Sequence, residues 1–215
     1  MEIEDKINVM YENVIKMFQH TMIFLEEAIS IYTNGKPSTP ITINDDEIDK
    51  LERQIEEECL LIILKERPFA TDLRKVTGIF KLVEDIERLG DHSEDIVWTI
   101  TNLSKYNDKN VHATSLMEMS SVAISMCQNS LKAFINQDEK LANEILKSDD
   151  YLDQLYLDSL KEIPEKKEMY NLDDSFIIYS TLLSKYLERI GDHAINIAEW
   201  TIYIKNGYYK DKVII

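Results

Sequence analysis

Apolar residues recur every three or four positions along most of the chain, which is the spacing of one helix face. Between Ile3 and Tyr32 this stripe is unbroken, and the sequence Asn34-Gly35-Lys36-Pro37 follows it. Gly and Pro just beyond an apolar stripe are typical of a helix end. The pattern therefore predicts a first helix from about Ile3 to Asn34.

The same spacing predicts five further helices, at about residues 44–67, 68–103, 110–135, 138–163 and 172–205. Asn44 and Glu47 are placed to form a capping box at the start of the second helix. Pro68 can open the third helix, and Pro164 should end the fifth. No stretch alternates as a half-buried strand does, so we predict an all-α fold of six helices.

A seven-residue motif occurs twice in the chain. Residues 86–92 read Ile-Glu-Arg-Leu-Gly-Asp-His, and residues 187–193 read Leu-Glu-Arg-Ile-Gly-Asp-His. This repeat predicts two tandem, pseudo-symmetric three-helix bundles, at residues 1–107 and 108–215. Glycine inside a helix costs about 1 kcal/mol relative to alanine. We therefore expect Gly90, which shares a face with buried positions, to allow a neighbouring helix to approach closely.

Composition and charge exclude several classes of protein. The 40 acidic and 24 basic residues give a net charge of −16, which disfavours nucleic acid as a partner. Cys59 and Cys127 lack metal-site or redox-motif spacing, so we expect buried thiols in a reducing compartment. The acidic N-terminus does not resemble a signal peptide, and no apolar stretch reaches the ~20 residues that span a bilayer. We expect a cytoplasmic protein that meets membranes only through partners.

The candidate functional residues are pairs of carboxylates spaced i, i+4, because these are the acidic positions on the helix faces that occur in both halves of the chain. Other acidic positions on the same faces change: Glu52, for example, is replaced by Tyr156 in the second half. If the paired faces meet, four hard oxygen ligands converge in each half and must bind cations or shift their pKa values. The candidate metal ligands are Asp45, Asp49, Glu87 and Asp91 in the first half, and Asp149, Asp153, Glu188 and Asp192 in the second.

The alternative for these carboxylates is a solvated acidic face, with Arg88 paired to Glu84 or Asp91. His92 and His193 lie about 140° around the helix from the first carboxylate of each motif, which favours packing or hydrogen bonding over ligation. The sequence has no Glu-x-x-His motif, phosphate loop or nucleophile elbow. Catalysis therefore has little support, although a metal-dependent hydrolase or oxidase that uses the same carboxylates stays the competing hypothesis, with a plain helical scaffold as a third.

The segment Lys65-Glu66-Arg67-Pro68-Phe69-Ala70-Thr71-Asp72-Leu73-Arg74, together with the two Glu-Arg-x-Gly-Asp motifs, resembles the PhoU family. The resemblance covers nearly the whole chain. It implies two tandem three-helix bundles in which Glu-x-x-x-Asp motifs hold metal clusters of iron, zinc or another divalent ion. The implied ligands are Glu87/Asp91 and Glu188/Asp192, and the acidic pairs on the second and fifth helices would complete each site.

The resemblance also implies a role and partners. PhoU-family proteins are cytoplasmic accessories of a phosphate ABC transporter, which implies contact with its ATPase subunit. They are also negative regulators of the phosphate-starvation response, usually through a sensor histidine kinase; we further expect a homodimer. The second half departs from the pattern, because Asp173-Asp174-Ser175 stands where the first half has Asp72-Leu73-Arg74. We expect the contact made by Arg74 to exist only once.

Overall fold

The computed structural model describes residues 2–34, 45–210 and 212–213, with the backbone alone at Asp45 and Val213. The predicted stop sequence Gly35-Lys36-Pro37 and the cap Asn44 lie outside the described residues. The all-α fold class is confirmed. The helices are α1 (Ile3–Asn34), α2 (Asp45–Glu66), α3 (Thr71–Leu103), α4 (Thr114–Asn136), α5 (Glu139–Leu146), α6 (Asp149–Tyr170) and α7 (Ser175–Asn206), and they are followed by a short antiparallel pair, β1 (Tyr208–Tyr209) and β2 (Lys212–Val213).

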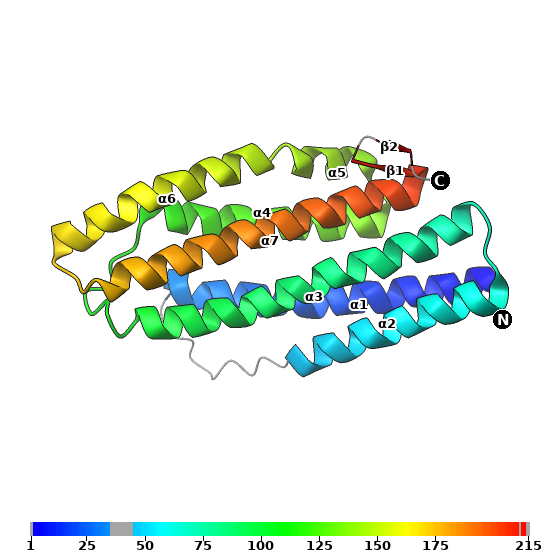
Figure 1. Cartoon of the computed structure of the whole chain (residues 1–215), viewed down its shortest axis with the longest axis horizontal. Coiled ribbons are helices and arrows are strands. Elements are labelled where there is room, and N and C mark those ends of the chain that lie inside the picture. The colour runs from blue at the N-terminus through cyan, green and yellow to red at the C-terminus, as the bar shows by residue number, and fades with distance from the viewer. Residues whose placement is uncertain (1, 35–44, 211, 214–215) are drawn as a thin grey trace.

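The long helices lie side by side along one axis, in two groups (Figure 1). Helices α1, α2 and α3 pack on one another, and α4, α6 and α7 form a second bundle with α5 beside α4 and α7. The two bundles meet mainly along α3 and α7, and also where α1 packs on α4. The boundary between residues 107 and 108 stays a prediction. The apolar stripes of both bundles form one continuous buried cluster, in which Phe18, Phe134 and Phe176 are the largest fully buried side chains.

The predicted fifth helix is wrong in its continuity and its end. The chain bends at Lys147 and Ser148, which separate α5 from α6. Ile145 in α5 and Leu152 in α6 are both buried, and their spacing of seven is two helical turns, so the apolar pattern runs through the bend without revealing it. Asp138 caps α5 as an N-cap, accepting a hydrogen bond from the backbone N–H of Leu141 at 3.1 Å.

Pro164 lies inside α6, which continues to Tyr170. A proline removes one backbone hydrogen bond, so other contacts must hold the helix on both sides of it. The Glu162 carboxylate accepts hydrogen bonds from the backbone N–H groups of Thr114 and Ser115 at 2.7 and 2.9 Å, at the start of α4. Burial opposes ionisation of Glu162, but these hydrogen bonds lower its pKa to about 2. The neighbouring Ile163 is fully buried, which anchors the same turn.

Helix α3 begins at Thr71 and not at Pro68, because Arg67 and Ala70 adopt positive φ angles of 50° and 46° and turn the chain before the helix starts. The Arg74 side chain donates hydrogen bonds to the carbonyls of Ile204 and Lys205, at 3.2 and 3.1 Å, and so caps the end of α7. In the second half, Ser175 occupies the counterpart position and donates its N–H to Asp173 at 2.8 Å.

The repeated glycine allows close helix packing in the second bundle. A Cβ added to Gly191 would lie 2.1 Å from Cδ2 of Leu152, so a side chain on α7 at this point requires the end of the Leu152 side chain on α6 to move. Gly90 is buried on α3, as its place on the apolar face predicts, and close approach of a neighbouring helix to it stays a prediction. Over the described part of the chain, every helix is too short or too polar to cross a lipid bilayer.

Candidate carboxylate site

The first carboxylate group lies where α2 packs against α3. Glu87 and Asp91 come from α3, one turn apart, and Asp49 faces them from α2. Burial, followed by the negative charge of Asp91, raises the pKa of Glu87 to about 7, and the charge of Asp49 on α2 adds to this effect. Three of the four predicted ligands thus interact electrostatically. The side chain of the fourth, Asp45, lies outside the described residues.

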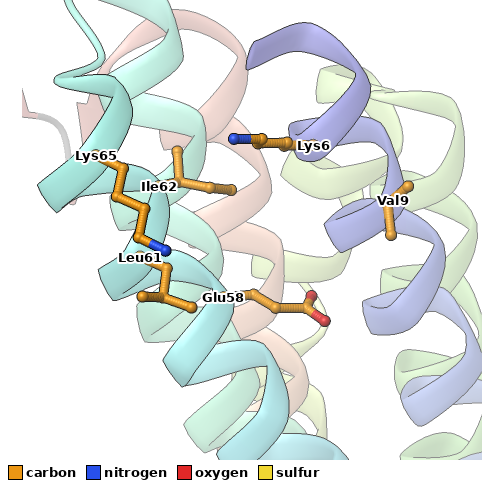
Figure 2. Close-up of a pocket in the computed structure, with 6 residues that line it drawn as sticks. All are labelled: Lys6, Val9, Glu58, Leu61, Ile62 and Lys65. Carbon is orange, nitrogen blue, oxygen red and sulfur yellow. The ribbon is translucent and has the colours of Figure 1, made fainter. Parts of the chain in front are cut away.

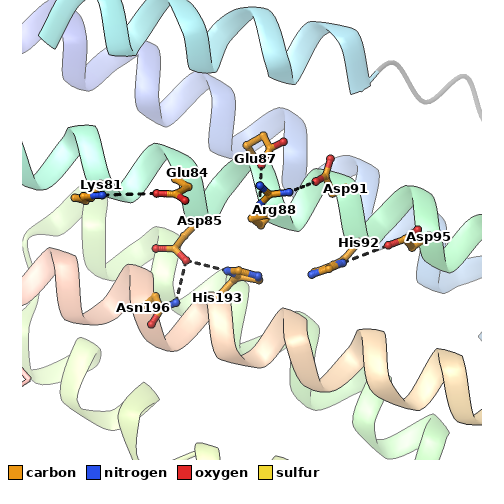
Figure 3. Close-up of polar contacts among 10 residues, drawn as sticks. All are labelled: Lys81, Glu84, Asp85, Glu87, Arg88, Asp91, His92, Asp95, His193 and Asn196. Atoms are coloured by element: carbon orange, nitrogen blue, oxygen red, sulfur yellow. Dashed lines mark hydrogen bonds and ion pairs between the residues drawn. The ribbon is translucent and has the colours of Figure 1, made fainter. Parts of the chain in front are cut away.

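Arg88 supplies the positive charge at this group. Its guanidinium contacts Asp91 at 2.8 Å and Glu87 at 3.4 Å (Figure 3). The pairing with Asp91 that the solvated-face alternative expects is therefore present. Glu84 instead lies 3.9 Å from Lys81.

The second group lies where α6 packs against α7. Burial and the charges of Glu188 and Asp149 raise the pKa of Asp192 to about 6. Burial and the charge of Asp153 likewise raise the pKa of Asp149. Here the local cation is Lys185, which lies 2.5 Å from Glu188 and also 5.5 Å from the ring of Tyr156. The four predicted residues of the second half are therefore electrostatic neighbours.

Neither group is arranged around a single point. Within the described ranges, no three Asp, Glu, His or Cys side chains converge closely enough to hold one ion. The donor chemistry nevertheless fits hard cations, because half-buried carboxylates with raised pKa values are stabilised by a nearby positive charge. Arg88 and Lys185 supply part of that charge through their ion pairs with these carboxylates.

The comparison of repeats missed Glu52, which Tyr156 replaces in the second half. Burial and the charges of Glu56 and Asp49 raise the pKa of Glu52 to about 6, and Glu52 in turn raises that of Glu87. It therefore belongs to the first group, and the two groups are not equivalent. In the sequence, Glu52 is indicated by the acid-rich run of α2. A comparison that keeps only residues identical in both halves discards it.

Polar side chains also meet between the bundles, along α3 and α7. Asp85 accepts hydrogen bonds from His193 at 2.8 Å and from Asn196 at 2.9 Å, and Asp95 lies 3.4 Å from His92 (Figure 3). Burial lowers the pKa of His92, so its neutral form is favoured. The predicted hydrogen-bonding contacts of the two histidines are present, whereas their preference over metal ligation stays a prediction. Asp85 was missed, because no period along one helix indicates which residue faces it from another helix.

A groove of about 240 Å³ lies between the start of α1 and the end of α2 (Figure 2). It is lined by Lys6, Val9, Glu58, Leu61, Ile62 and Lys65. Its aliphatic floor and charged rim are typical of a protein contact surface. Leu64 and Phe69, on the same end of the bundle, are 72% and 87% exposed, so apolar surface continues beyond the groove.

Comparison with known proteins identifies the family to which the chain belongs. A family model described as the PhoU domain matches the chain twice, at residues 7–99 and 116–201. The chain belongs to the PhoU family. Each match includes one Glu-x-x-x-Asp motif and the helix that faces it, so both carboxylate groups lie within PhoU domains.

Several PhoU relatives are similar over nearly their whole length. The phosphate-specific transport system accessory protein PhoU homolog 1 of Thermotoga maritima is 32% identical over 206 residues, covering 95% of this chain and 89% of the relative. A PhoU homolog of Borreliella burgdorferi is 31% identical, covering 95% and 92% of the two chains. PhoU from Pseudomonas aeruginosa superposes with a TM-score of 0.71 at 28% identity over 96% of both chains. The phosphate transport system regulatory protein PhoU from Streptococcus pneumoniae superposes over the whole of both chains with a TM-score of 0.84; at 23% identity, this likeness concerns the fold.

Proposed function

We propose that the chain is a non-enzymatic, cytoplasmic accessory protein that regulates a phosphate transport system. The observation that carries this proposal is its similarity, over 95% of its length, to relatives named as accessory proteins of phosphate-specific transport. The contacts that we propose are with the ATPase subunit of a phosphate ABC transporter and with a sensor histidine kinase. Through them the protein, as a homodimer, restrains the phosphate-starvation response.

We further propose that each carboxylate group binds divalent or trivalent metal, with iron or zinc as the first candidates. The raised pKa values of Glu87 and Asp192 support this, since carboxylates held together at a cost to ionisation favour a cation. The ligands would be Asp45, Asp49, Glu87 and Asp91 in the first half and Asp149, Asp153, Glu188 and Asp192 in the second. Bound metal would supply positive charge that neutralises these faces and makes them available for docking.

Metal content and thermal stability test the metal part. We expect chelation to lower the melting temperature, because an ion that binds only the folded state stabilises it by about 2.7 kcal/mol at a hundredfold excess over Kd. The double variant Glu87→Gln, Asp91→Asn should lose about half of the metal that the two carboxylate groups bind. Glu84→Gln, on the same helix, is the matched control and should retain it. Equal melting curves for verified metal-free and metal-saturated protein would instead support the alternative that these carboxylates form a solvated acidic face.

A pull-down with transporter subunits tests the accessory role. The net charge of −16 predicts attraction to a basic partner surface, so binding should weaken as salt rises to physiological values. Binding that does not depend on salt would indicate that the partner contacts the apolar surface around Leu61 and Leu64. Phosphatase, nucleotidase or ferroxidase turnover that disappears in Glu87→Gln would replace the accessory role with the enzymatic alternative.

A further inference from the structure

Two histidines face each other across the boundary between the bundles. His92 lies on α3 and His193 on α7, and their ring centroids are 5.5 Å apart. Each ring turns its Nδ1 toward a carboxylate and its other edge toward the second histidine (Figure 3). Nδ1 of His193 lies 2.8 Å from Asp85, and Nδ1 of His92 lies 3.4 Å from Asp95.

These carboxylates determine the form of the two rings. Each Nδ1 has a carboxylate oxygen as its neighbour, and the tautomer with the proton on Nδ1 lets that carboxylate accept a hydrogen bond. Nε2 of each ring then presents a lone pair. The His92 side chain is only 9% exposed, and no hydrogen-bonding partner for its buried Nε2 exists among the described residues. Nε2 of His92 is thus a buried acceptor without a described partner, and Nε2 of His193 is the nitrogen that faces it.

We propose that Nε2 of His92 and Nε2 of His193 bind one divalent transition-metal ion of the Zn²⁺ type, which links the two bundles. Imidazole nitrogen suits Zn²⁺, and metal-bound histidines commonly donate their other N–H to a carboxylate, as Asp85 and Asp95 allow here. With metal–nitrogen bonds of about 2.0–2.1 Å, two rings that share one tetrahedral ion have centroids about 5 Å apart. The observed 5.5 Å already matches this spacing.

This site differs from the carboxylate groups in place and chemistry. Its nitrogen ligands come from α3 and α7, one from each bundle, whereas each carboxylate group lies within one bundle and offers oxygen alone. Tyr186, whose ring lies 5.7 Å from His92, borders the pair from α7, and Asn196 donates a hydrogen bond to Asp85. The remaining positions around the ion would be filled by water. The proposal is therefore independent of metal binding by the carboxylates.

NMR of the histidine ring nitrogens tests the proposal directly, with Zn²⁺ as the probe on the full-length protein labelled with ¹⁵N-histidine. Before Zn²⁺ is added, both rings should show protonated Nδ1 and unprotonated Nε2. One equivalent of Zn²⁺ should shift the Nε2 resonances of His92 and His193 together. His20→Gln is the matched control, because it removes a surface histidine of α1 and should leave these shifts unchanged.

Variants separate this site from its neighbours. His92→Gln should abolish the Zn²⁺-dependent shift at His193, and His193→Gln the shift at His92, with each variant's fold checked by its remaining resonances. The double variant Glu87→Gln, Asp91→Asn should keep both shifts, so failure of the carboxylate proposal leaves this one standing. The proposal would be overturned if the Nε2 resonances did not shift in excess Zn²⁺. It would also be overturned if the shifts were lost in the Glu87→Gln, Asp91→Asn variant.

Discussion

Replacing Glu87 with Gln should stabilise the metal-free protein at alkaline pH. The pKa of Glu87 is raised from 4.5 to about 7 by burial and by Asp91, so the folded protein binds this proton more tightly than the unfolded chain does. Stability contributed by the proton is fully present below pH 4.5 and is lost as pH rises through about 7. Gln carries no proton to lose, so the variant should avoid that loss.

The size of the effect follows from the same difference. Each pKa unit corresponds to about 1.4 kcal/mol, so the full difference corresponds to about 3 kcal/mol. The Glu87 side chain is 15% exposed and lies beside the half-exposed Arg88, and solvent screening reduces the expected gain to about 1–2 kcal/mol. Loss of the 3.4 Å contact with the exposed Arg88 subtracts little.

Urea unfolding in excess chelator, at pH 4.5 and pH 8.5, provides the measurement. We expect equal stabilities for native protein and Glu87→Gln at the lower pH, and a more stable variant at the higher pH. Glu84→Gln, an exposed carboxylate on the same helix, should show no such dependence. A variant that is less stable than the native protein at pH 8.5 without metal would refute the reasoning. With metal present, the sign should reverse, because Gln removes a ligand.

Two substitutions and one labelling experiment test the packing. Gly191→Ala should destabilise the protein by about 1 kcal/mol in thermal unfolding, since overlap with Leu152 outweighs the better helix propensity of Ala; a gain in stability would show that Leu152 moves aside freely. Arg74→Ala should lower the free energy of unfolding in urea by about 1 kcal/mol, because it removes the cap of α7. An unchanged midpoint would show that water replaces Arg74 as the hydrogen-bond donor to these carbonyls. Cys59 and Cys127 should resist a thiol reagent at pH 8 until the protein unfolds, because burial raises the pKa of Cys59 to about 12 and that of Cys127 further; rapid labelling of the folded protein would contradict this.

Features that depend on one helix at a time could be predicted from the sequence. The apolar stripe after Ile3 indicates α1, and the repeated motif places Glu87/Asp91 and Glu188/Asp192 on matching helices. Periodicity also predicts the buried side of α3, on which Gly90 lies.

Features that depend on contacts between distant segments could not be predicted. Pro164 reads as a helix end because the sequence does not show that Glu162 binds the start of α4. Asp85 looks like one more acidic surface residue until His193 and Asn196 face it from α7. Glu52 was discarded because the halves were treated as equal, whereas a duplicated fold lets each copy change its charges separately.

The single buried cluster that runs through both bundles has a thermodynamic consequence. Tyr11 of α1 stacks on Phe134 of α4 with ring centroids 5.3 Å apart, and α3 and α7 share a long boundary, so neither bundle can melt without exposing apolar surface of the other. The duplicated chain should therefore unfold in one cooperative step. A ligand bound in one half then stabilises helices in the other half as well, because it shifts a single folding equilibrium. Occupancy in one half should thus be measurable as slower opening of helices in the other half.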